Sequence, residues 1–345
     1  MASGLGGAGV WALWKAAGGA APSLSSLNFT LGDTAGGGLS IIATGTNLSS
    51  ASAVTIGGNS ATITGNTSTT VTFTLPAHAS GSVNVTVTTA GGTSNALSFE
   101  YWTPSQVTGG VIWYDAERGV TQSSNNVSQW ADQGGGGVNA SQSTGAQKPV
   151  WTASVFGSLH SLRFTRANSS LLTLTAQTVG TIGAVTYRAG IKSTDATGTA
   201  GGAAGVDAAN NLFGGSSGGG TANCGMGGGG TAGNVAVYAF DGSAWQPCLG
   251  GSSVNDGNPH IIGANINGNT KVVQAVKDGA NVGSAGTLGA GGFVDVAGFD
   301  SIGCGFSGLD PFGGDLGWLL FLPAAISGGD DTKLTAWSKQ RWGTP

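Results

Sequence analysis

The chain has 345 residues, of which 66 are glycine and only 8% are charged, and its formal net charge is −4. Charged helical bundles and coiled coils need many more Lys, Arg and Glu residues on their surfaces, so this composition excludes both. The 12 Lys and Arg residues are spread thinly and form no basic stripe, so nucleic acid is not an expected partner. The length suffices for two domains of unequal size, each with its own core.

The first 21 residues are rich in Ala and Gly and place Trp11 and Trp14 three positions apart. On a helix this spacing would put both indoles on one face, which predicts a segment that anchors the chain to a partner subunit. The alternative is a floppy terminus whose tryptophans fold back on the adjacent domain. A basic n-region is missing and Lys15 interrupts the apolar run, so the segment makes a poor signal peptide. No window approaches the roughly 20 apolar residues that span a bilayer, so we expect no membrane insertion.

Short runs of alternating apolar and polar residues follow between Pro22 and Tyr101. Clusters of Gly, Asn and Ser separate these runs, which predicts about six or seven short strands, the strand density of a sandwich domain. The clearest runs lie at residues 54–56, 61–63, 71–75 and 83–87.

Glycine turns recur in a characteristic order through the same region, at residues 36–38, 45–48, 57–58 and 91–95, before Phe99 and Tyr101. Together with the strand runs they resemble an IPT/TIG immunoglobulin-like domain over residues 22–102. The resemblance implies a spacer or interaction module and not a catalyst.

The pattern of residue types changes after Thr103 and Pro104, so we place a domain boundary at about 102–107. Residues 111–116, 127–134, 148–151 and 162–164 resemble the opening of the concanavalin A-like, laminin G-like domains of phage and bacterial surface proteins. The resemblance implies a jelly-roll sandwich over residues 107–345.

Later segments agree with this interpretation. Residues 259–264, 272–279 and 314–321 read as long strands, whereas residues 330–342 predict a short C-terminal helix with an apolar face of Leu334 and Trp337. The adjacent Asp330 and Asp331 are interpreted as an N-cap and a first-turn charge. Residues 193–235 are dominated by small residues and leave two alternatives, a long loop or glycine-rich strands packed closely against another backbone. The predicted fold class is all-β, with an immunoglobulin-like sandwich followed by a concanavalin A-like jelly roll.

Two glycine-rich strings match catalytic or cofactor motifs only by letter. Residues 214–218 fit the G-x-S-x-G elbow of hydrolases, but no strand, helix and histidine flank them in the required order. Residues 225–230 fit a dinucleotide fingerprint without the accompanying parallel strand, helix and acidic residue. We therefore expect no nucleotide cofactor.

Metal sites are also not expected. The histidines His78, His160 and His260 are isolated from one another, and three cysteines without CxxC spacing predict unpaired buried thiols, although a bridge from Cys224 to Cys248 stays open. Calcium is possible in a sandwich of this kind, but no sequence feature indicates it.

Carboxylates are too few for the usual glycosidase pair. The only glutamates are Glu100 and Glu117, and they fall in different domains. Because glycoside hydrolysis normally requires two carboxyl groups across the sugar, we predict that the protein is not an enzyme.

Sugar binding needs only an aromatic face and a few polar groups, so the aromatic residues are the candidates for a ligand site. Trp113, Tyr114, Trp130 and Trp151 lie in strand-like contexts and are assigned to the core. Tyr238 and Trp245 flank a predicted turn that contains Asp241, and we expect this group to be exposed on a loop and to bind a ligand.

The resemblances together suggest a virion component of a tailed phage: a head-decoration, tail or fibre protein on the particle exterior. Its partners would be other virion proteins, held through residues 1–21, and a host-surface glycan, contacted in many copies or as a homo-oligomer. One alternative is an extracellular, cell-surface carbohydrate-binding adhesin of a bacterium. A second alternative is a polysaccharide depolymerase.

Overall fold

The computed structural model describes residues 19–177, 180–181, 183–195, 211–214, 222–228, 231–295, 299–304 and 311–345. The chain divides into two compact units, Met1–Tyr101 and Trp102–Pro345. Trp11 and Trp14 of the predicted anchoring segment lie outside the described residues. No helix in the described part of the chain is long and apolar enough to cross a membrane.

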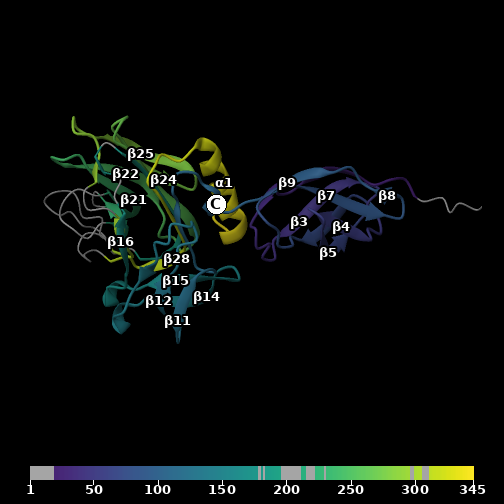
Figure 1. Cartoon of the computed structure of the whole chain (residues 1–345), viewed down its shortest axis with the longest axis horizontal. Helices are drawn as coiled ribbons and strands as arrows, with labels where there is room; N and C mark the ends of the chain where they lie inside the picture. The colour runs from purple at the N-terminus through teal and green to yellow at the C-terminus, as the bar shows by residue number, and fades with distance from the viewer. Residues whose placement is uncertain are drawn as a thin grey trace, which may run out of the picture. The chain divides into compact units, whose positions relative to one another are not determined.

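The first unit is an immunoglobulin-like sandwich of short strands (Figure 1). One face consists of β1 (Ser23–Leu27), β3 (Ser40–Thr46), β6 (Thr70–Thr74) and β5 (Asn59–Asn66). The other consists of β4 (Ala53–Ile56), β7 (Gly81–Thr89), β8 (Gly92–Thr93), β9 (Leu97–Tyr101) and β2 (Leu31–Gly32). Strand β5 pairs with both β6 and β4 and so joins the two faces.

The alternation seen in the sequence explains this sandwich. In β6 the side chains of Val71 and Phe73 are fully buried, while the threonines between them face outward. Each such apolar side chain contributes about 1.5–3 kcal/mol on burial. Gly36 has a φ of +69°, and a Cβ there would lie 2.4 Å from the carbonyl oxygen of Leu75, so this turn requires glycine.

The second unit is a large antiparallel sandwich. Its first layer is built around β28 (Gly314–Leu322), which pairs with β18 (Ala184–Lys192) on one side. On the other side β28 pairs with β10 (Ile112–Asp115) and β15 (Leu159–Phe164). The layer continues from β18 to β23 (Pro259–Asn267), β24 (Val272–Lys277) and β25 (Ala280–Thr287), and from β15 to β14 (Val150–Phe156).

A second set of strands packs against this layer, with β21 and β22 lying beside β24 and β25. It runs through β12 (Asn126–Trp130), β13 (Ala140–Ser141), β16 (Leu172–Gln177), β27 (Phe299–Ile302), β19 (Asn211–Gly214), β20 (Ala222–Gly228), β21 (Thr231–Phe240) and β22 (Trp245–Ser253). Strand β11 (Val120–Ser123) pairs with β12, and β17 (Gly180–Thr181) pairs with β26 (Val294–Asp295). The short 3-10 turns are η1 (Pro104–Gln106), η2 (Gly145–Gln147) and η3 (Arg166–Asn168).

Helix α1 (Gly328–Trp342) packs against β28. Trp337 of the helix packs edge-on against Trp318 and Trp113, with ring centroids 5.5 and 5.8 Å apart. Trp318 also donates a 3.0 Å hydrogen bond through its indole Nε1 to Ser338. Because β28 is covered on both faces, nearly all of its residues are buried, which explains its continuous apolar sequence.

The helix begins two residues earlier than the sequence predicts. Ser327 is the N-cap, and its hydroxyl oxygen accepts a hydrogen bond from the backbone N–H of Asp330. The assignment of an aspartate as the N-cap is therefore wrong: Asp330 and Asp331 both lie in the first turn, where carboxylates interact favourably with the helix dipole.

The small-residue region forms strands over residues 211–214, 222–228 and 231–235. Strands β19, β20 and β21 pair in succession as antiparallel neighbours, so the glycine-rich strand alternative applies to them. The segment 225–228 belongs to β20, which excludes a dinucleotide-binding turn there. The serine of the G-x-S-x-G string lies outside the described residues.

Candidate functional site

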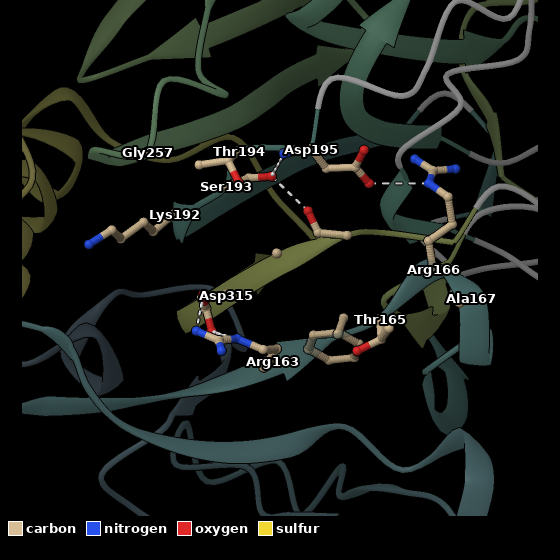
Figure 2. Close-up of a pocket in the computed structure, with 13 residues that line it drawn as sticks. Arg163, Thr165, Arg166, Ala167, Lys192, Ser193, Thr194, Asp195, Gly257 and Asp315 are labelled. Atoms are coloured by element: carbon tan, nitrogen blue, oxygen red, sulfur yellow. Dashed lines mark hydrogen bonds and ion pairs between the residues drawn. The ribbon is translucent and has the colours of Figure 1, made fainter.

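A cavity of about 580 Å³ opens in the second unit at the start of β28 (Figure 2). Four distant parts of the sequence line it: residues 163–167, 192–195, 257 and 313–315. Strand pairing explains why they meet. Asp315 is in register with Arg163 of β15 and with Lys192 of β18, so these three residues lie side by side across the layer.

Arg163 and Asp315 form a two-pronged ion pair in the wall of the cavity. The Nε and Nη2 groups of Arg163 each donate a 3.0 Å hydrogen bond to a different carboxylate oxygen of Asp315. The hydroxyl of Ser161 donates a further 2.7 Å hydrogen bond to Asp315. This planar arrangement fixes the guanidinium group in one orientation.

A second ion pair joins Arg166 to Asp195, with 3.2 Å between Nε and the carboxylate. Ser193 holds the same wall together, because its hydroxyl donates to the carbonyl oxygen of Gly313 at 2.6 Å and accepts from the backbone N–H of Asp195 at 3.0 Å. A Cβ at Gly313 would lie 2.1 Å from the Asp195 carboxylate, so the close approach of these segments needs glycine.

The loop before β23 closes another side of the cavity. The backbone N–H of Gly257 donates a 2.9 Å hydrogen bond to the carbonyl oxygen of Ser193. The side-chain amide of Asn255 contacts the carbonyl oxygen of Asp195 at 3.4 Å. The cavity wall is thus assembled from hydrogen bonds between loops.

Behind this loop His260 is buried between two aspartates. Its Nδ1 lies 2.9 Å from the carboxylate of Asp278, and its Nε2 lies 3.2 Å from that of Asp256. Hydrogen bonding to Asp278 raises the pKa of His260, burial acts in the opposite direction, and Asp256 raises the pKa further. His260 is therefore a hydrogen-bonded core histidine.

The predicted ligand group at Tyr238, Asp241 and Trp245 is not an exposed platform. Tyr238 lies within β21 and is 1% exposed, so the prediction that it sits on an open loop is wrong. Trp245 is half-buried at the start of β22 and packs against Tyr238 and Phe240. The reason is that β21 continues to Phe240, which carries Tyr238 into the sheet before the turn begins.

Asp241 serves the turn between β21 and β22. Its carboxylate oxygens accept four hydrogen bonds. Three come from the backbone N–H groups of Ser243, Ala244 and Gly289, and the fourth comes from the side-chain amide of Gln246. Burial by itself would raise the pKa of Asp241, but these hydrogen bonds outweigh it and lower the pKa to about 2. Asp241 thus holds this turn together, and a ligand role for it stays a prediction.

Three of the four other aromatic residues assigned to the core are buried, and the fourth, Trp151, is not. Trp113, Tyr114 and Trp130 are at most 2% exposed. Trp151 is half-buried and stacks on His160, with ring centroids 3.7 Å apart, and His160 in turn lies 2.9 Å from the Glu117 carboxylate.

Cys248 is a free, buried thiol, so the structure contains no disulfide between Cys224 and Cys248. Among the described residues, no three His, Cys, Asp or Glu side chains gather closely enough to hold a metal ion.

Sequence reasoning missed the cavity residues. Arg163, the pair Lys192 and Asp195, and Asp315 lie far apart in the sequence, and none belongs to a motif that indicates a binding site. The available signal is their rarity, because a chain with 8% charged residues has little reason to place four of them next to buried strands.

Comparison with known proteins resolves the first unit. Residues 22–101 match the family model of the IPT/TIG domain. The first unit is an IPT/TIG domain. The whole chain has no match among curated protein sequences.

Several solved structures resemble the second unit weakly. Domain 4 of an extracellular arabinanase from Geobacillus stearothermophilus, in complex with arabinotriose, has a TM-score of 0.45 at 12% identity, covering 65% of this chain and 97% of that one. The Botulinum neurotoxin serotype D ligand binding domain with N-acetylneuraminic acid has a TM-score of 0.45 at 9% identity, covering 70% and 55%. The CBM40 domain of a Ruminococcus gnavus sialidase, bound to sialyllactose, has a TM-score of 0.35 at 14% identity, covering 51% and 95%. Functional assignment therefore depends on the cavity itself.

Proposed function

We propose that this protein is a non-catalytic, glycan-binding adhesive protein. The β-sandwich of Trp102–Pro345, which we interpret as concanavalin A-like, carries the binding site, and the IPT/TIG domain acts as a spacer. The observation that carries the proposal is the cavity at the start of β28, whose side chains are mostly charged or hydroxyl-bearing.

The lining suits a ligand that is covered with hydroxyl groups. Thr165, Ser193 and Thr194 offer hydroxyls, and two arginine–aspartate pairs offer fixed donors and acceptors. A volume of about 580 Å³ falls within the range of small-ligand pockets, roughly 300–1,000 Å³, and leaves room for one or two sugar rings. An apolar ligand would leave the charged groups desolvated without partners, which is unfavourable.

Binding without catalysis fits the arrangement of the two acids in the cavity. Asp195 and Asp315 each contact an arginine, and Figure 2 shows their carboxylates turned toward Arg166 and Arg163 respectively. Glycoside hydrolysis needs a carboxyl group that donates a proton to the leaving oxygen and a second that acts on the sugar. The arginine contacts of both acids support adhesion over the depolymerase alternative.

Sugar sites of this size bind weakly, so adhesion would depend on several copies of the chain acting together. We extend the proposal to an exterior location, on a bacterial cell surface or on a phage particle. Two further points stay predictions: that residues 1–21 attach the chain to other virion proteins, and that the chain forms a homo-oligomer.

The test is a glycan array probed with the full chain and with two substitutions. Thr194→Trp places a bulky ring on an exposed cavity residue, whereas Thr270→Trp does the same at an exposed turn that does not line the cavity. We expect wild type and Thr270→Trp to bind the same glycans, and Thr194→Trp to lose at least tenfold in affinity. If folded wild-type protein bound no glycan, or if Thr194→Trp bound as well as wild type, the proposal would be wrong.

A further inference from the structure

We infer that the cavity at the start of β28 selects sugars that carry a carboxylate, such as uronic acids, over their neutral counterparts. The inference rests on the proposed glycan-binding function. It adds the chemical class of the ligand.

The first observation is the unused edge of the Arg163 guanidinium. Its Nε and Nη2 groups are bound to Asp315, and within the described part of the chain its Nη1 has no hydrogen-bond partner. A guanidinium has five N–H donors, so a ligand can still be bound after two have been used. The Asp315 pair holds this edge in place before a ligand arrives, which lowers the entropy lost on binding.

The second observation is the lysine in the neighbouring strand. Lys192 lies in register with Asp315, on the side opposite Arg163. Its ammonium group contacts the carbonyl oxygen of Val155 at 3.3 Å, which accounts for one of its three donors. Two cationic side chains therefore come from the positions on either side of Asp315, and both retain free donors among the described residues.

The third observation is how unequally the opposite charges are exposed. The side chain of Arg163 is 48% exposed, whereas its partner Asp315 is 11% exposed. The same order holds in the second pair, where Arg166 is 28% and Asp195 is 18% exposed. In both pairs the arginine side chain is therefore more accessible to a ligand than its aspartate partner.

These features favour an anion with planar acceptor geometry. A carboxylate can accept from the Arg163 edge, while Lys192 adds a second positive charge to the cavity lining, and charge-assisted hydrogen bonds are stronger than those to a neutral hydroxyl. We expect the acidic sugar to bind about tenfold or more tightly than its neutral match. Because the cavity is open to solvent, this advantage should shrink as ionic strength rises.

The experiment measures affinity by calorimetry with the full chain and matched ligand pairs: trigalacturonate and its methyl ester, glucuronate and glucose oligomers, and sialyllactose and lactose. Lys192→Gln removes one cation, and Lys277→Gln is its control. Lys277 also donates to a backbone carbonyl, that of Ser253 at 2.7 Å, but it does not line the cavity. Arg163→Gln is the second test variant, and Arg163→Lys, which keeps the charge, should recover part of the affinity.

The expected result is a preference for the acidic member of at least one pair, lost in Lys192→Gln and Arg163→Gln and kept in Lys277→Gln. Equal affinity for acidic and neutral members, blocked by Thr194→Trp, would overturn this inference and leave the proposed function intact. An acidic preference that survives both cavity substitutions would also overturn it. Absence of binding to every glycan in the array would overturn both.

Discussion

Arg188 of β18 and Asp331 of α1 form a two-pronged ion pair that joins the helix to the sheet. The Arg188 side chain is 1% exposed, and its Nε and Nη2 groups donate to the two Asp331 oxygens at 3.0 and 2.8 Å. The Nη1 group donates to the backbone carbonyls of Tyr187 and Ala264, so the buried guanidinium is well supplied with acceptors.

The first prediction concerns this pair. Asp331→Asn leaves the Arg188 charge buried with no opposite charge, which should destabilise the second unit by about 3 kcal/mol. Asp330→Asn is the matched control, because Asp330 lies in the same helical turn but its carboxylate accepts a hydrogen bond from the Ser327 cap and not from Arg188, and should cost about 1 kcal/mol or less. Urea denaturation followed by tryptophan fluorescence measures the difference. The stretch 19–101 contains no tryptophan, so the signal reports mainly the second unit.

The second prediction concerns the packing beneath the helix. A Cβ at Gly190 would lie 2.2 Å from Nε1 of Trp318, which is the donor to Ser338. Gly190→Ala should therefore displace Trp318 and cost about 1–3 kcal/mol. Gly145→Ala is the control, since nothing lies within 4 Å of a Cβ there, and its effect should stay within about 0.5 kcal/mol. Equal stabilities of the two variants in a thermal melt would contradict this account.

The third prediction is an acid sensitivity of the turn between β21 and β22. The hydrogen bonds to Asp241 lower its pKa from an ordinary value of 3.8 to about 2. The ionised carboxylate thus contributes stability that is present above pH 3.8 and lost as the pH falls toward 2. Asp241→Asn should destabilise the unit by about 1–3 kcal/mol at pH 6, and the gap from wild type should narrow at pH 3. A constant gap in urea denaturation at both pH values would contradict the prediction.

The fourth prediction is a loosening of the cavity wall at high pH. The pKa of His260 is raised above its ordinary value of 6.5, chiefly by the hydrogen bond to Asp278. The protonated ring holds Asp256 and Asp278 together, a contribution fully present below pH 6.5 and lost as the pH rises through the folded-state pKa. The Gly257 amide should then exchange faster with solvent, relative to the intrinsic rate. In His260→Gln the Gly257 amide should exchange fast at every pH. In the control His78→Gln, which lies in the IPT/TIG domain, its exchange should follow the wild-type pH dependence.

Sequence patterns were informative where burial follows a simple period. Val71 and Phe73 alternate with threonines, so the strand and its inward face could be predicted directly. The same holds for Leu334 and Trp337 on the helix. Tyr238 shows where such patterns fail. The turn signal that follows it predicts an exposed side chain, but β21 extends to Phe240, so Tyr238 is buried in the sheet.

The amino-acid sequence by itself determined the two all-β units, their order and the closing helix, because the periodicity of side chains and the placement of glycines are local properties. Only the tertiary structure decided which polar residues meet. Arg163, Lys192 and Asp315 come from three strands separated by many residues, and strand register alone brings them into one wall. Register depends on long-range strand pairing, so no local sequence pattern around these three residues predicts the cavity.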